Sequence, residues 1–120
     1  MKILTIDDNQ DITELLTITL TAMGHEVTSS NTGQEGLKLL TNNRYDVVLL
    51  DLAMPDFSGR DVINKLETMG NLKDFNIVIF TASSINDSEI ESLIKKGVCG
   101  IIRKPIEVDQ LEKEISKLAS

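Results

Sequence analysis

The sequence predicts an α/β fold of the doubly wound class, with a parallel sheet covered by helices on both faces. Three short runs, Ile3–Ile6, Val47–Leu50 and Ile77–Phe80, are almost continuously apolar, which is the pattern of strands buried on both faces. Segments with helical periodicity separate them, and such alternation is typical of right-handed βαβ crossovers. We therefore expect a five-stranded parallel sheet with five helices, in a single domain over residues 1–120.

Five segments have the composition of strands. They are Lys2–Ile6, Glu26–Ser30, Asp46–Leu50, Asn76–Phe80 and Gly100–Arg103. The order of these strands within the sheet does not follow from periodicity, because the pattern does not specify which strands are neighbours.

Apolar stripes at three- and four-residue spacing mark the helices between the strands. The first helix is expected to end at Gly24, and the third and fourth at Gly70 and Gly97, since glycine commonly follows a helix. The second begins at a capping box, Thr32–Glu35, and runs to about Asn42. We expect the stripes of the first, third, fourth and fifth helices in the core: Ile12, Leu15, Leu16, Leu20 and Met23; Val62, Ile63, Leu66 and Met69; Ile90, Leu93 and Ile94; and Val108, Leu111, Ile115 and Leu118.

The charge of the chain restricts its partners. Nineteen acidic residues against 12 basic ones give a net charge of −7, which repels nucleic-acid phosphates and anionic lipids. We therefore expect no direct binding to nucleic acid or membrane, and partners that are cations or basic protein patches. The only cysteine, Cys99, cannot form an internal disulfide, and neither a signal peptide nor a run of ~20 apolar residues is present. These features predict a cytoplasmic protein.

Polar and charged side chains follow the ends of four expected strands. They are Asp7 and Asp8 after the first, Asp51 after the third, Thr81 (followed by Ala82) after the fourth, and Lys104 after the fifth. In an open α/β sheet, ligands bind beyond the carboxyl ends of the strands. We therefore expect these residues to meet at one edge.

The chemistry of this group favours phosphoryl transfer. Neighbouring carboxylates repel one another by ~1 kcal/mol in water, and a hard divalent cation such as Mg²⁺ compensates such repulsion. Asp51 is the expected nucleophile toward phosphorus, while Lys104 and Thr81 are placed to hold phosphoryl oxygens.

Simpler roles exist for each residue alone. Asp7, Asp8 and Asn9 also suit the N-terminal cap of the first helix, and Thr81 and Lys104 are ordinary residues for their positions. The phosphoryl-transfer interpretation depends on their convergence at one edge.

The whole chain resembles the response-regulator receiver domains of two-component signalling. The resemblance lies in the pair Asp7-Asp8, the D-x-x-M-P-x-x-S-G run at Asp51–Gly59, Thr81-Ala82, and Lys104-Pro105. It implies a flavodoxin-like strand order, 2-1-3-4-5.

The resemblance also implies roles for individual residues. Asp51 would accept a phosphoryl group from a histidine kinase or phosphotransfer protein. Asp8 would bind Mg²⁺ directly and Asp7 through water, with Asp51 and the Ala53 backbone carbonyl as further ligands. Phosphoryl oxygens would be bound at Thr81, Ala82 and Lys104, and the Lys104–Pro105 peptide bond is expected to be cis.

Two positions of the expected switch differ from the usual family pattern. Ile101 stands where many members carry an aromatic residue that moves with the threonine, and Ile106 replaces a second aromatic residue. Because an aliphatic side chain displaces less volume, we expect weaker coupling between Thr81 and Ile101. Ala53 and Ser83 flank the site where the family tunes the lifetime of the phosphoryl group.

The expected function is a phosphorylation-activated switch that assists its own phosphorylation and dephosphorylation and is not otherwise an enzyme. The alternative is a phosphorylation-independent protein-interaction module. A flavin protein is disfavoured by the acids after the first strand, and a dehalogenase-type phosphatase by Ala53, where an acid is needed. His25 is expected at the surface and Cys99 as a packed small side chain. The downstream target is open, as is the choice between a monomer and a weak dimer.

Overall fold

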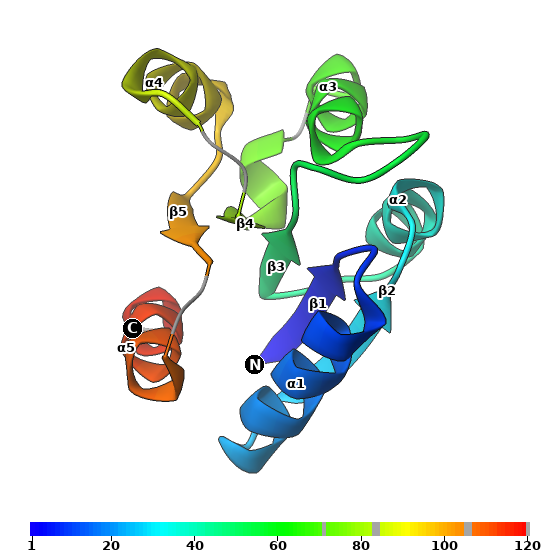
Figure 1. The fold of residues 1–120 in the computed structure, drawn as a ribbon. Helices are drawn as coiled ribbons and strands as arrows, with labels where there is room; N and C mark the ends of the chain where they lie inside the picture. Colours follow the sequence, from blue (N-terminus) through cyan, green and yellow to red (C-terminus); the bar gives the residue numbers. More distant parts are fainter. Residues whose placement is uncertain (71, 83–84, 105–106, 120) are drawn as a thin grey trace.

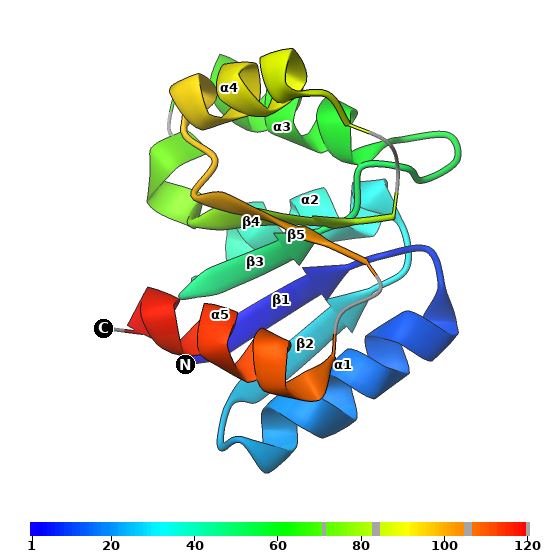
Figure 2. The same cartoon turned by 60° about the vertical axis from the view of Figure 1, so that its left-hand side comes forward.

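A parallel sheet with the strand order β2-β1-β3-β4-β5 forms the centre of the computed structural model (Figures 1 and 2). The structure describes residues 1–70, 72–82, 85–104 and 107–119. The strands are β1 (Lys2–Ile6), β2 (Glu26–Ser30), β3 (Val47–Leu50), β4 (Ile77–Thr81) and β5 (Gly100–Arg103). The predicted fold class and strand order are therefore confirmed.

Helices cover both faces of this sheet. They are α1 (Gln10–Ala22), α2 (Gly33–Asn42), α3 (Gly59–Thr68), α4 (Asp87–Lys96) and α5 (Val108–Ala119), and a 3₁₀ turn η1 (Leu72–Phe75) precedes β4. In Figure 1, α1 and α5 lie on one face, while α2, α3 and α4 lie on the other. This arrangement leaves the carboxyl ends of β1, β3 and β4 accessible at one edge.

Side-chain caps explain where the helices begin. Thr32 Oγ1 accepts a hydrogen bond from the Glu35 amide at 3.1 Å, which is one half of the predicted capping box, whereas the Thr32 amide donates to Ser30 Oγ at 3.4 Å. A capping box with both of its hydrogen bonds begins α3, where the side chains of Ser58 and Asp61 each accept a hydrogen bond from the other's backbone amide. Gly97 ends α4 with φ 124°, a conformation that glycine adopts without strain.

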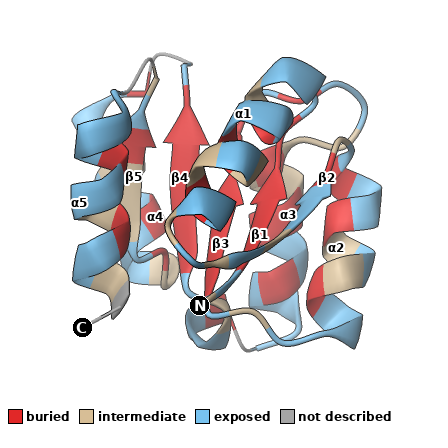
Figure 3. Cartoon of the chain, turned by 90° about the horizontal axis from the view of Figure 1, so that it is seen from below, coloured by how far each residue is buried: buried red, intermediate tan, exposed pale blue. Residues whose placement is uncertain are grey.

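Two apolar clusters fill the space between the sheet and the helices. Because side chains alternate along a strand, Leu4, Val48 and Leu50 face α2, α3 and α4, whereas Ile3, Val47 and Leu49 face α1 and α5. The central strands are buried in Figure 3, as the apolar runs predict.

Five residues predicted to be buried are exposed instead. They are Leu15, Met69, Ile94, Val108 and Cys99. The sheet covers only the middle of each stripe, so residues at a helix end or at the margin of a stripe remain in contact with solvent. Next to Cys99, the buried position is taken by Val98. No helix in the described part of the chain is long and apolar enough to cross a bilayer.

Candidate functional site

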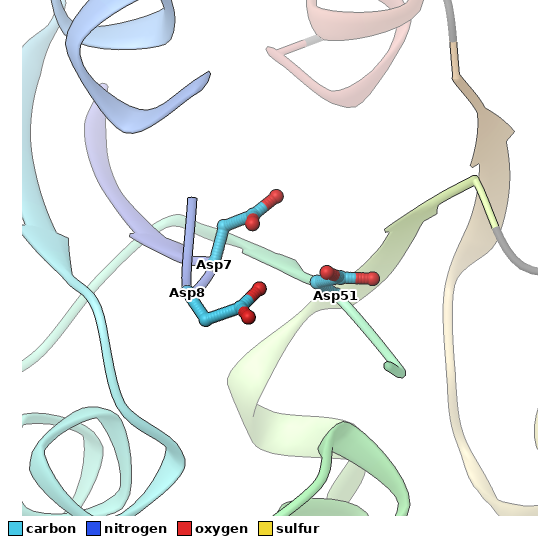
Figure 4. A group of neighbouring side chains, drawn as sticks. All are labelled: Asp7, Asp8 and Asp51. Carbon is cyan, nitrogen blue, oxygen red and sulfur yellow. The ribbon is translucent and has the colours of Figure 1, made fainter. Parts of the chain in front are cut away.

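Three aspartates gather at the carboxyl ends of β1 and β3 (Figure 4). The two strands are neighbours, with Ile6 opposite Leu50, so Asp7 and Asp8 follow β1 beside Asp51, which follows β3. One carboxylate oxygen of each aspartate lies within 4.8 Å of the others. Asp7 and Asp51 are only 2% and 6% exposed, whereas Asp8 is exposed. The predicted convergence of the acids is confirmed.

Backbone hydrogen bonds hold two of these aspartates to the sheet beyond the formal strand ends. The Asp7 amide donates to the Ser30 carbonyl at 3.0 Å, and the Asp51 amide donates to the Ile6 carbonyl at 2.9 Å. Both side chains therefore start from a rigid backbone.

The Asp51 carboxylate has a defined orientation. Its Oδ1 accepts hydrogen bonds from Thr81 Oγ1 at 2.9 Å and from the Ala53 amide at 3.2 Å. Its Oδ2 lies 3.6 Å from Lys104 Nζ. The residues predicted after β3, β4 and β5 thus meet around one carboxylate.

Lys104 connects the two buried aspartates. Its ammonium group forms an ion pair with Asp7 as well as with Asp51, and it lies 5.3 Å from the centroid of the Phe80 ring. Its side chain is only 10% exposed. Sequence reasoning missed the role of Phe80, because the residue belongs to an apolar strand and carries no polar signal.

The donor set fits a magnesium ion. Lys104 pairs with only two of the three grouped carboxylates, which leaves excess negative charge in a partly buried site. Carboxylate and carbonyl oxygens are the ligands that Mg²⁺ prefers, and Asp7, Asp8 and Asp51 supply them. The Ala53 carbonyl, two residues along from Asp51, is the further ligand that the resemblance implies.

The capping role considered for the acids belongs mainly to Asn9. Its side chain accepts from the amides of Asp11 and Ile12 at 2.9 and 3.3 Å. Asp7 supports the turn, since its Oδ1 accepts from the Asn9 amide at 3.0 Å. Asn31, which sequence reasoning missed, donates from Nδ2 to the Asp7 carbonyl at 2.8 Å.

The segment between β3 and α3 begins beneath the site. Leu52 and Met54 are buried in it. At its end, a Cβ built on Gly59 would lie 2.2 Å from the Asp51 carbonyl oxygen. Only glycine fits there, so Gly59 holds the end of this segment against the backbone of Asp51.

An ion pair that the sequence did not predict connects α3 to α4. Arg60 donates to both carboxylate oxygens of Glu89, at 3.0 Å from Nε and 2.6 Å from Nη2. This hydrogen bonding raises the pKa of Arg60 and lowers that of Glu89. The pair joins the two helices that follow Asp51 and Thr81 along the chain.

The remaining predicted residues are placed as follows. Ile101 is partly buried and packs against the cluster on the α2, α3 and α4 face. Ala82 is exposed directly after Thr81. The predictions for Ser83, Pro105 and Ile106, including the cis peptide bond, fall outside the described residues.

The two residues judged to be peripheral differ in their surroundings. His25 is partly buried, and its Nδ1 lies 3.0 Å from the Met1 ammonium nitrogen. Desolvation and this ammonium charge lower the pKa of His25. Cys99 is exposed as a residue, but partial burial raises the pKa of its thiol, so it does not have the low pKa of a reactive cysteine.

Comparison with known proteins agrees with this site. The family model of the response regulator receiver domain matches residues 3–116. The chain is 30% identical over 114 residues to the two-component response regulator ARR10 of Arabidopsis thaliana, covering 93% of this chain and 20% of that protein. It is 32% identical over 111 residues to the response regulator MprA of Mycobacterium sp. (strain KMS), covering 92% and 47%. The chain therefore spans less than half of the length of either relative.

Solved structures show the same architecture. The chemotaxis protein CheY4 of Vibrio cholerae superposes with a TM-score of 0.86 at 25% identity, covering 98% of this chain and 97% of that one. The response regulator TrrA of Thermotoga maritima, solved in complex with Mg²⁺ and BeF, has a TM-score of 0.83 at 32% identity, with the same coverage. With its fold, its acidic site and these similarities in agreement, the chain belongs to the response regulator receiver domain family.

Proposed function

We propose that this domain is a signalling switch in which Asp51 accepts a phosphoryl group from a histidine kinase or a phosphotransfer protein. The observation that carries the proposal is the surroundings of the Asp51 carboxylate, where Thr81, Lys104 and two further aspartates meet. A carboxylate that only stabilised the fold would not require two acids beside it.

The transfer is a displacement at phosphorus. An Asp51 carboxylate oxygen forms the new P–O bond while the P–N bond to the donor imidazole breaks, and the imidazole leaves with the bonding electron pair and takes up a proton. Thr81 Oγ1 and Lys104 Nζ already flank the carboxylate, which supports their proposed role in binding phosphoryl oxygens. The later attack of water on phosphorus restores Asp51 and releases phosphate.

Receiver domains bind Mg²⁺ at an acidic pocket, and here Asp7, Asp8, Asp51 and the Ala53 carbonyl would hold the ion. When bound, it would neutralise charge on the phosphoryl oxygens. The domain promotes reactions of its own side chain and releases no other product, so we propose that it is not a conventional enzyme.

The donor protein must approach Asp51 from outside the sheet edge. An apolar groove of about 380 Å³ between α1 and α5 is lined in part by Leu15, Val108 and Lys104, and Lys104 also contacts Asp51. We propose that this groove receives an apolar helix face of the donor, which would place its phosphohistidine beside Asp51.

The output would follow from a change of state in the segments after β4. Phosphorylation adds about −1.5 to −2 charges next to Thr81 and Lys104. It would therefore change the contacts that these two side chains make at the carboxyl ends of β4 and β5. Ile101 lines a cavity of about 490 Å³ with Ile90 and Glu107 on the α4–β5–α5 face. A change in this face would alter the affinity for a downstream protein.

The test is intact-protein mass spectrometry after incubation with acetyl phosphate. We expect one phosphoryl adduct in the presence of Mg²⁺, no adduct with EDTA, and no adduct on Asp51→Asn. Asp56→Asn is the matched control, because Asp56 is an exposed acid of the same segment outside the acidic group. An adduct that persists on Asp51→Asn would refute the assignment. A protein that binds neither Mg²⁺ nor a phosphoryl group would be a phosphorylation-independent interaction module.

A further inference from the structure

The start of α2 touches the segment that connects β3 to α3. A Cβ built on Gly33, the first residue of α2, would lie 2.3 Å from the carbonyl oxygen of Phe57 and 2.8 Å from its Cδ2 atom. Figures 1 and 2 show this segment, drawn in green, running out past the end of α2 before it enters α3. The contact joins parts of the chain that are distant in sequence.

The connecting segment has a defined conformation around this contact. Asp56 adopts a positive φ of 64°, and the Phe57 amide donates to the Pro55 carbonyl at 2.7 Å. The Phe57 side chain is partly buried against the core cluster. Together with Gly59, which closes on the Asp51 carbonyl, these contacts fix the segment at two points.

We propose that Gly33 and Phe57 are positioning residues for the Asp51 site. They would act by fixing the segment that begins with Ala53, whose amide already bonds Asp51 Oδ1 at 3.2 Å and whose carbonyl would be a metal ligand. This inference rests on the proposed function. It means that α2, which contributes no residue to the site, helps to hold the residues of the site in position.

A methyl group at Gly33 should move the segment. Ordinary contacts of a Cβ begin at about 3.4 Å, so the Phe57 carbonyl would have to retreat by roughly 1 Å, a displacement that is costly for catalytic positioning. Because the clash is with a backbone oxygen, no side-chain rotation relieves it. Gly33 does not have a positive φ, so alanine is compatible with the helix itself.

Leu40→Ala is the matched control on the same helix. Leu40 is buried near the far end of α2 and lies beside Tyr45 and Asn76. Its truncation weakens the packing of α2 and introduces no clash with the connecting segment or with the strand ends of the site. Phe57→Ala is the second variant, since it removes the anchoring side chain and introduces no clash.

Two measurements test the proposal. The first is the Kd for Mg²⁺ by isothermal titration calorimetry. The second is amide hydrogen exchange of Leu52–Ser58 in the metal-free protein, which does not depend on any ligand. For Gly33→Ala we expect an Mg²⁺ Kd about tenfold higher and faster exchange in this segment. Phe57→Ala should change both in the same direction, while Leu40→Ala should keep both at the wild-type value even if its stability falls.

The outcomes separate this inference from the proposed function. Equal Kd and equal exchange in Gly33→Ala, Phe57→Ala and wild type would overturn the positioning role and leave Mg²⁺ binding intact. An equal loss in Leu40→Ala would also overturn it, because general loosening of α2 would then suffice. A wild-type protein that does not bind Mg²⁺ would instead refute the proposed function, and the exchange data would still decide whether Gly33 orders the segment.

Discussion

Replacing Lys104 with methionine should destabilise the domain, and Mg²⁺ should reverse part of this loss. The ammonium group stands between Asp7 and Asp51, and all three side chains are at most 10% exposed. Methionine keeps much of the aliphatic volume of the side chain and removes the charge. Two buried carboxylates would then face each other and Asp8 without a cation.

The cost can be worked from the geometry. At 3.6 Å and an effective dielectric constant of about 20, the attraction between Lys104 and Asp51 is roughly 4–5 kcal/mol before desolvation. The closer pair with Asp7 adds to it, whereas the variant avoids the cost of burying the ammonium group. Removal of one partner from a buried pair typically costs about 3–5 kcal/mol, and we expect about 3 kcal/mol here.

Magnesium should recover about half of this loss relative to wild type, because both proteins gain from the ion and the variant gains more. A ligand at 100 times its Kd stabilises the native state by about 2.7 kcal/mol. Because Lys104 no longer competes for Asp7 and Asp51, the variant should also bind Mg²⁺ about tenfold more tightly than wild type, which corresponds to about 1.4 kcal/mol of additional stabilisation.

Urea unfolding followed by far-UV circular dichroism, in EDTA and in saturating Mg²⁺, measures both effects. Lys113→Met is the control for loss of a lysine charge, since Lys113 is exposed on α5. A Lys104→Met variant within about 0.5 kcal/mol of wild type in EDTA, which is the range of ordinary surface substitutions, would refute the reasoning. So would an equal gain from Mg²⁺ in the two proteins.

Three further predictions concern residues outside this site. The hydroxyl of Thr5 is buried without a hydrogen-bond partner in the described part of the chain, so Thr5→Val should raise the free energy of unfolding by about 1 kcal/mol, and a loss of stability in urea titration would contradict this. Arg60 lowers the pKa of Glu89, so the pair should stabilise the fold above the ordinary carboxyl pKa of 4.5 and lose this effect as pH falls through the lowered pKa of the folded state. Because both side chains are partly exposed, a double-mutant cycle should give at most about 1 kcal/mol at pH 7 and less at pH 4. Desolvation and the Met1 ammonium lower the pKa of His25, so the contribution of the neutral imidazole to the free energy of unfolding is complete above pH 6.5 and is lost at lower pH. Wild type should therefore lose more stability than His25→Gln between pH 7.5 and pH 5.5. Parallel plots of stability against pH for the two proteins would exclude this role of His25.

Much of the site was predictable because of where the strands end. The run Val47–Leu50 is buried on both faces, so Asp51 had to emerge at the sheet edge, and the same reasoning placed Asp7 and Lys104 there. The strand order could not be predicted in this way, and only the resemblance to a family implied it. Which strands are neighbours depends on how the crossover helices pack, and a local apolar pattern does not report that packing.

The strands and helices, and the residues that they bring to one edge, follow from the sequence alone, because local periodicity specifies the elements and parallel strands share one direction. Other features of the site come from tertiary packing: Asp7 is buried while Asp8 is exposed, Lys104 pairs with Asp7 and lies over Phe80, and Gly33 meets Phe57. Each of these depends on a distance between segments far apart in the chain. Such distances are set by the packing of whole layers, to which every element contributes.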